Sequence, residues 1–432
     1  MVSRRPYEKS RYYALGYGRL DDCMDDVEAA RTFVGAGAEL LQKNLTKNRK
    51  PILETNKGEK RMVTRRHRKG KIVLIILACI IAVLAIIAFI FLKITFLKSF
   101  PKLTGEPEVG KWYDIKVDGA RSSDGSEWHG IFKKGTENKV VVYFFGGGVS
   151  ITPETSEGGN KFYATNMTGQ DFVAEGGIGS NAENNPFKNW SFLVIPYATG
   201  DFHSGTGVYD GKKTVYHTGY SNYAAFVEQM KPYVDEPDTL LVTGFSAGGF
   251  ATSLLADDVI DRFPSAKNIT VCVDSSLLLY DGWHETAVNL WQSPKEISDR
   301  LVTDNLVLDS LTALHEKRGD SVKILFDCSY RDDTLQQYQA YIRTGTMTKN
   351  KENGDLFQKD LTEMVKGLQG NIPGVGIYIW NHAEDAETHN TQHTIISSNV
   401  FDELEDGVSV ADWIYSAVNG DVQSHGLTLL EE

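Results

Sequence analysis

The stretch DTLLVTGFSAGGFATSLLADDVIDRFP, residues 238–264, decides the fold. A short apolar run leads into the turn GFSAGGF and then into a segment with helical spacing, which predicts a strand, a tight turn and a helix. The turn matches G-x-S-x-G, a pattern in which a strained backbone lifts a serine above the edge of a sheet. Ser246 is therefore the predicted nucleophile, and the N–H of Ala247 is the predicted first donor to an oxyanion.

The same alternation of strand and helix continues on both sides of this turn. Segments with helical spacing separate continuous apolar runs. Such runs are typical of strands in a sheet that helices cover on both faces, so the predicted fold class is α/β with a mostly parallel sheet. The predicted strands are 139–148, 191–197, 268–276, 322–330 and 374–382, and the predicted helices are 220–234, 304–317, 333–343 and 357–367.

A membrane segment is predicted ahead of this domain. Residues 72–92, IVLIILACIIAVLAIIAFIFL, are 21 uncharged residues, enough to cross a hydrocarbon core of about 30 Å as a helix. The basic run KRMVTRRHRKGK precedes them and only Lys93 and Lys98 follow closely, so we expect the N-terminus in the cytoplasm. The predicted single-pass protein of the cell membrane has a cytoplasmic tail (1–71), a span (72–92), a stem (93–109) and an extracytoplasmic domain (110–432).

Charge and cysteine content limit the partners. Residues 1–71 carry 18 Lys and Arg against 9 Asp and Glu, whereas the remaining residues carry 27 against 48. The acidic outer domain is not expected to bind nucleic acid or to attract a polyanion.

Cys272 and Cys328 are the two cysteines of this domain; they indicate no disulfide framework, and a single bond between them stays open. No partner of residues 1–70 can be identified.

A second oxyanion donor is predicted in FFGGGVS, residues 144–150, because glycine-rich loops after an early strand serve this purpose in esterases. A phosphate-binding loop is disfavoured, since no Lys-Ser/Thr follows the glycines and no G-x-G-x-x-G is present. The candidate donors in this loop are Gly147, Gly148 and Val149.

Ordered motifs of the outer domain resemble the pectin acetylesterase/Notum carboxylesterase family. They are DGSEWHGIFKKGTENKVVVYFFGGG (124–148), NPFKNWSFLVIPYATGDFHSG (185–205), GFSAGGFAT (244–252) and VDSSLLLYD (273–281). The resemblance implies an α/β-hydrolase fold and a serine carboxylesterase, of a bacterial-type, membrane-anchored kind. The sequence departs from the family at Val149 and Ser150, where the family has Trp-Cys.

The acid of the predicted triad should lie between the serine and the histidine in chain order, just past a strand. The stretch FDCSYRDDTLQQYQ, residues 326–339, offers three aspartates, of which Asp327 falls within the apolar run and is interpreted as structural. The resemblance implies a D-x-x-Q pattern, which Asp333 fits. Asp333 is therefore the predicted acid, with Asp332 second and Asp274, after the preceding strand, third.

The base is predicted in NHAEDAETHNTQHTI, residues 381–395, which follows the last strand. The order HTI followed by DGVSVADWIYSAV resembles bacterial-type members and favours His393, with His382 second and His389 third. The i,i+4 pair of His389 and His393 lacks the glutamate of H-E-x-x-H and lies in a poorly helical segment, so no metal and no cofactor are expected.

These residues predict an ester hydrolase that works through an acyl-enzyme, with Ser246, His393 and Asp333 as its triad. The preferred substrate is an O-acetyl ester of a glycan or a similar molecule. The alternatives are a fatty-acyl ester hydrolase and a catalytically dead, membrane-anchored binding protein on a hydrolase scaffold.

The insertion 277–319 contains Trp283 and Trp291. It predicts either a lid or sugar-stacking wall, or a packed pair of helices.

Overall fold

The computed structural model describes residues 75–78, 80–86, 99–234 and 236–431. Residues 75–78 and 80–86 belong to one unit of the chain, and the described residues from 99 onward belong to another. Residues 75–78 and 80–86 are helical, but the rest of the predicted span and the tail 1–71 lie outside the described residues. Within the described ranges, no helix is both long enough and apolar enough to cross a bilayer.

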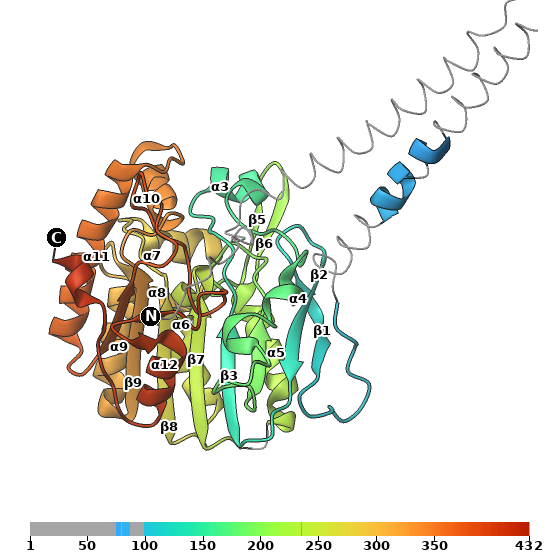
Figure 1. The fold of residues 1–432 in the computed structure, drawn as a ribbon, viewed down its shortest axis with the longest axis horizontal. Coiled ribbons are helices and arrows are strands. Elements are labelled where there is room, and N and C mark those ends of the chain that lie inside the picture. The colour runs from blue at the N-terminus through green and yellow to red at the C-terminus, as the bar shows by residue number, and fades with distance from the viewer. Residues whose placement is uncertain (1–74, 79, 87–98, 235, 432) are drawn as a thin grey trace, which may run out of the picture. The chain divides into compact units, whose positions relative to one another are not determined.

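The larger unit is built on one sheet of eight strands, in the order β1-β2-β4-β3-β7-β8-β9-β10 (Figure 1). The pairs β1–β2 and β2–β4 are antiparallel, and every neighbouring pair from β4 to β10 is parallel. The predicted mostly parallel α/β sheet is therefore confirmed. The strands are β1 (Trp112–Arg121), β2 (Glu127–Lys133), β3 (Lys139–Phe144), β4 (Ser191–Ile195), β7 (Thr239–Phe245), β8 (Asn268–Asp274), β9 (Val322–Ser329) and β10 (Gly376–Trp380).

Helices follow the strands and cover the sheet. Figure 1 shows α12 in front of β8 and β9, with α6 on the opposite face. Two small hairpins, β5 (Gly207–Asp210) with β6 (Thr214–His217) and β11 (Leu404–Glu405) with β12 (Val408–Ser409), lie outside the main sheet. The helices are α3 (Pro153–Gly158), α4 (Gln170–Val173), α5 (Gly219–Met230), α6 (Ala247–Arg262), α7 (Trp283–Glu285), α8 (Lys295–Ser298), α9 (Leu306–Arg318), α10 (Leu335–Thr344), α11 (Lys351–Asn371) and α12 (Val410–Val418).

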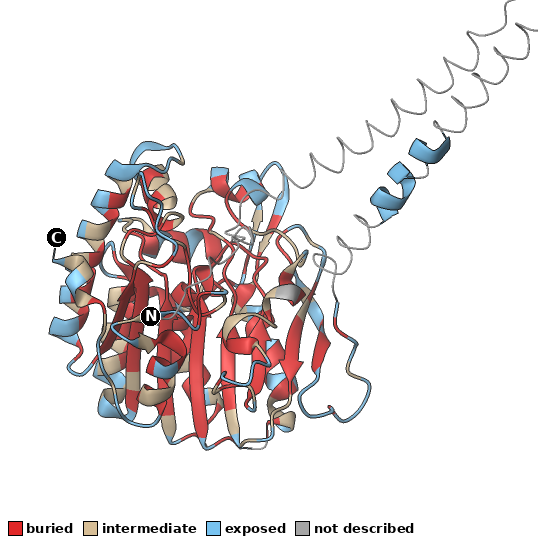
Figure 2. Ribbon diagram, viewed as in Figure 1, coloured by how far each residue is buried: buried red, intermediate tan, exposed pale blue. Residues whose placement is uncertain are grey.

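The core runs along the central strands. All residues of β4, β7 and β10 are buried, as expected for apolar strands with helices on both faces, and Figure 2 shows the buried colour concentrated on the sheet. Cys272 and Cys328 are buried there as free thiols, so the disulfide that the sequence left open does not form.

The insertion between β8 and β9 packs into this core. Trp283 and Trp291 are fully buried, and their rings lie 5.7 and 5.5 Å from that of Phe202. Phe202 in turn stacks on Phe250 of α6 at 4.3 Å. Of the two readings of these tryptophans, the structure supports packed helices, and neither ring is free to stack on a sugar.

Candidate active site

Ser246 occupies a strained turn between β7 and α6. Its φ and ψ are 54° and −126°, a conformation that costs a non-glycine residue about 1–3 kcal/mol and persists where its surroundings hold it. Its N–H donates to the Asp274 carbonyl at 3.0 Å, and its own carbonyl accepts from Ser276 Oγ at 2.9 Å. The flanking glycines are required by close approach: a Cβ at Gly248 would lie 2.0 Å from the Phe144 carbonyl oxygen. The predicted strand, turn and helix are confirmed.

His393 pairs with a buried carboxylate. Its Nδ1 lies 2.6 Å from Asp332 Oδ2, and the other carboxylate oxygen accepts N–H bonds from Thr334 at 3.0 Å and Leu335 at 2.8 Å. Because Nδ1 donates to the carboxylate, the proton sits there and Nε2 carries the lone pair. Among the described residues, Nε2 is buried with no hydrogen-bond partner. Burial alone would lower the pKa of His393, but the charge and hydrogen bond of Asp332 raise it above the ordinary value.

Asp333, the acid predicted from the sequence, does not make this contact. Its Oδ2 forms an ion pair with Lys349 at 3.0 Å, and its Oδ1 accepts from Thr334 Oγ1 at 3.0 Å. The side chain is partly exposed, whereas that of Asp332 is fully buried. The structure therefore corrects the choice between the two neighbours: the partner of His393 is Asp332. The D-x-x-Q pattern favoured Asp333, the neighbour whose side chain binds Lys349 and not His393.

Asp274 holds the histidine loop to the end of β8. Its Oδ2 accepts the N–H groups of Ile395 at 3.0 Å and Ile396 at 2.9 Å, and Ser275 Oγ accepts that of Thr394 at 3.2 Å. Because the Asp274 carbonyl also binds the N–H of Ser246, this residue joins the serine turn to the loop of His393. Asp274, the third candidate acid, thus binds backbone groups of the loop that carries the imidazole.

Asp327 lies beside Asp274 in the register of β8 and β9 and is fully buried. Burial, reinforced by the charge of Asp274, raises the pKa of Asp327 well above its usual range. Burial also raises the pKa of Asp274, against the hydrogen bonds it accepts. A neutral Asp327 can donate a hydrogen bond to Asp274, which fits the structural role expected of a carboxyl group inside an apolar strand.

The other two histidines of the loop have different surroundings. His382 stacks on Trp380, and its Nδ1 lies 3.5 Å from the exposed Glu403, while burial lowers its pKa. His389 is exposed and pairs with Glu384 at 2.6 Å. Of the three, His393 is the one bound to a fully buried carboxylate. The segment forms turns, so His389 and His393 do not share a helix face.

The glycine loop after β3 packs directly against the serine. A Cβ at Gly146 would lie 2.7 Å from Ser246 Cβ, and Gly148 has a φ of 79° that favours glycine. Val149 donates its N–H to the Phe162 carbonyl at 3.0 Å, so it does not offer the oxyanion donor that the sequence had included. Gly147, Gly148 and Ala247 stay the candidate donors.

Sequence reasoning missed His203, which supports this loop. Its Nε2 donates to the Phe145 carbonyl at 2.9 Å, and burial lowers its pKa to about 4, so the ring is neutral. Asp201 fixes the residue by accepting its backbone N–H at 3.0 Å. The only signal for this role was the position of His203 inside the motif 185–205.

Part of the chain matches a known protein family. Residues 112–312, from β1 into α9, match the family model described as Pectinacetylesterase. This range contains Ser246 and ends before Asp332 and His393. No curated protein matches the chain.

A solved structure, that of the Wnt deacylase Notum from Drosophila, matches with a TM-score of 0.53 and 15% identity. The match covers 72% of this chain and 94% of that chain, and it shows a shared α/β-hydrolase-like fold. The predicted family resemblance is confirmed, whereas nothing in these comparisons bears on a bacterial-type, membrane-anchored member.

Proposed function

Proceeding from the pectinacetylesterase-family domain of residues 112–312, which makes this chain an esterase-type hydrolase, we propose a serine carboxylesterase with the triad Ser246, Asp332 and His393. The observation that carries the proposal is the buried contact of 2.6 Å between His393 Nδ1 and Asp332 Oδ2. Asp274 supports it, because its carbonyl and carboxylate bind the serine turn and the histidine loop at once.

Each group has one task in this mechanism. Ser246 Oγ attacks the ester carbonyl while His393 Nε2 takes its proton and later passes it to the leaving alcohol. Asp332 keeps the other imidazole proton on Nδ1 and stabilises the charged ring. The N–H of Ala247, with that of Gly147 or Gly148, binds the oxyanion, and water then attacks the acyl-enzyme with His393 as the base.

The substrate we propose is an O-acetyl ester of a neutral glycan or similar molecule. Ser246 and His393 are each only 8% exposed, and this limited exposure favours a short acyl group over a long one. Residues 72–432 carry 48 acidic against 27 basic side chains, a field that repels a polyanionic chain at long range. The alternatives are a fatty-acyl ester and a binding protein without turnover.

The test is an ester panel from acetyl to octanoyl, hydrolysed by the purified full-length chain and by its Ser246→Ala variant. We expect turnover that is highest for acetyl and that the variant loses by at least about 10³-fold. A maximum at octanoyl would favour the fatty-acyl alternative. Equal rates for the two proteins, or no turnover by either, would sink the proposed enzyme.

We also propose that residues 72–92 anchor the protein in a membrane, with residues 1–71 in the cytoplasm and the hydrolase domain outside. The support is the uncharged run of 21 residues and the basic segment before it.

A further inference from the structure

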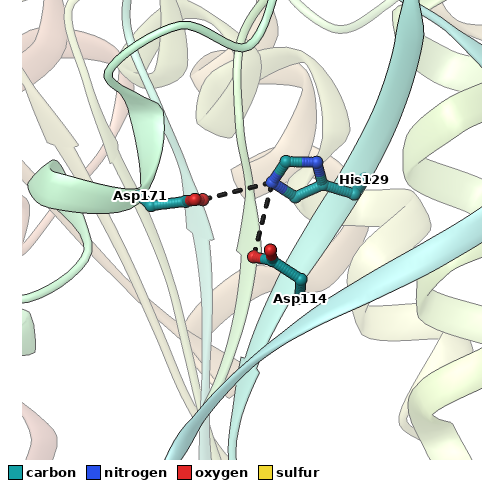
Figure 3. A group of neighbouring side chains, drawn as sticks. All are labelled: Asp114, His129 and Asp171. Carbon is teal, nitrogen blue, oxygen red and sulfur yellow. Dashed lines mark hydrogen bonds and ion pairs between the residues drawn. The ribbon is translucent and has the colours of Figure 1, made fainter. Parts of the chain in front are cut away.

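A second cluster of chemically active side chains lies at the antiparallel edge of the sheet. Asp114 of β1, His129 of β2 and Asp171 of α4 converge there (Figure 3). His129 Nε2 lies 3.1 Å from Asp171 Oδ1 and 3.5 Å from Asp114 Oδ1. One atom from each residue falls within 4.8 Å of the others, and none of the three belongs to the proposed triad.

Hydrogen bonding within the protein leaves this cluster incomplete. Figure 3 shows both carboxylates directed at the same ring nitrogen, which can carry a single proton and point it at one oxygen. Asp171 takes that bond. Asp114 is only 9% exposed, and its Oδ1 has no hydrogen-bond partner among the described residues. A buried carboxylate oxygen without a partner is costly, so the site calls for a further positive group.

We propose that Asp114, His129 and Asp171 bind a divalent transition-metal ion of the Zn²⁺ class. Two ligand atoms at the usual zinc distances lie about 3.3 Å apart in a tetrahedral site, and the distances of 3.1 and 3.5 Å bracket this value. A neutral imidazole favours zinc-like ions over Mg²⁺ and Ca²⁺, and two carboxylates balance the charge of the ion. His129 is half-buried, so a water from solvent would complete the fourth position.

The ion would join the paired strands β1 and β2 to α4. The chain before β1 is bound to Asp114, whose N–H donates to the Pro101 carbonyl at 3.0 Å. The segment after α4 reaches the histidine loop, where the N–H of Ile178 donates to the Ile396 carbonyl at 2.9 Å. The expected role of the ion is therefore to stabilise the domain where the chain enters it. The sequence analysis expected no metal and did not suggest this role.

The test strips the full-length chain with a chelator and titrates Zn²⁺ back, with bound metal and Tm as readouts. We expect the wild type to bind one equivalent more than His129→Gln or Asp171→Asn, and Zn²⁺ to raise the Tm of the wild type alone. His315→Gln, which removes a half-buried histidine of α9 that does not belong to the cluster, is the matched control and should behave as the wild type. Equal stoichiometry in wild type and His129→Gln would overturn the proposal.

A second measurement guards against variants that fail to fold. Crystals of the unaltered chain soaked with Zn²⁺ should show an anomalous peak between the three side chains at the zinc absorption edge. A well-ordered site without that peak would also refute the metal site. Because both readouts are binding and stability, their outcome does not depend on whether the proposed esterase activity is found.

Discussion

At the scale of single residues, the two neighbouring aspartates of the turn after β9 differ in burial and partner. Asp332 is fully buried on His393, whereas Asp333 forms a surface ion pair with Lys349. We predict that Asp332→Asn lowers kcat/KM by about 10³–10⁴-fold, because the amide no longer fixes the imidazole tautomer. Asp333→Asn, the matched control, should stay within about threefold, since an exposed ion pair contributes little. Steady-state kinetics on an acetyl ester measure both, and the opposite ranking would restore Asp333.

The pH dependence of the reaction follows from the same contact. His393 must be neutral to accept the serine proton, so kcat/KM should fall as the pH drops through its pKa. Asp332 raises that pKa above the ordinary value of 6.5, so the wild-type midpoint should lie above 6.5. The Asp332→Asn variant lacks the negative charge that raises the pKa of His393. We therefore predict that the midpoint of its residual activity moves to lower pH. A full pH–rate profile of each protein measures the midpoint. An unmoved midpoint in Asp332→Asn would show that Asp332 does not raise the pKa of His393.

Residue by residue, the sequence predicted those site positions that a local pattern defines. The turn motif predicted Ser246 and Ala247, the position after the last strand allowed all three histidines of residues 381–395, and the family resemblance favoured His393 among them. Asp332, which contacts His393 in the structure, ranked second to Asp333 in the sequence, because the partner of each of two adjacent turn residues depends on tertiary packing. His203 was missed, since its bond to the Phe145 carbonyl joins residues 58 positions apart.

At the scale of elements, the strands β8 and β9 share a buried carboxyl pair under the site. A fully buried Asp327 whose pKa is raised well above normal binds a proton in the folded protein that the unfolded chain releases above a pH of about 3.9. Stability from this group is complete below that pH and is lost as the pH rises toward the folded pKa. We predict a fall of about 1.4 kcal/mol per pH unit in this window.

Asp327→Asn should flatten this dependence, because the amide can donate to Asp274 without a titrating proton. Denaturant unfolding at several pH values measures the slope for each protein. Asp118→Asn, a substitution of an exposed aspartate on β1, is the control and should keep the wild-type slope. An equally steep slope in Asp327→Asn would show that this carboxyl group is ionised in the folded state.

The elements themselves were largely predictable where burial is complete. The continuous apolar runs correspond to β3, β4, β7, β8, β9 and β10, and the helical spacing to α5, α9, α10 and α11. The antiparallel strands β1 and β2 were not assigned as such, because their exposed positions break the apolar run. Two of the three proposed metal ligands, Asp114 and His129, lie on these strands and the third, Asp171, lies on α4, so the sequence alone could not bring them together.

At the scale of the whole molecule, the charge is divided between two parts of the chain. The tail 1–71 is basic, the remainder is acidic, and the apolar run 72–92 separates them. Two mechanisms of membrane association follow: insertion of the apolar run, which salt does not reverse, and attraction of the tail to anionic lipids, which salt screens within a Debye length of about 8–10 Å.

We predict insertion, because an uncharged helix of this length is bound far more firmly than a basic patch. Full-length protein should stay in the membrane fraction through a wash at 1 M salt and be released by detergent. A chain of residues 99–432 should be soluble and should keep the same kcat/KM, because the whole sheet and both halves of the proposed site lie within it. Release of the full-length chain by salt alone would assign the membrane association to the basic tail. The apolar run would then not be inserted in the membrane.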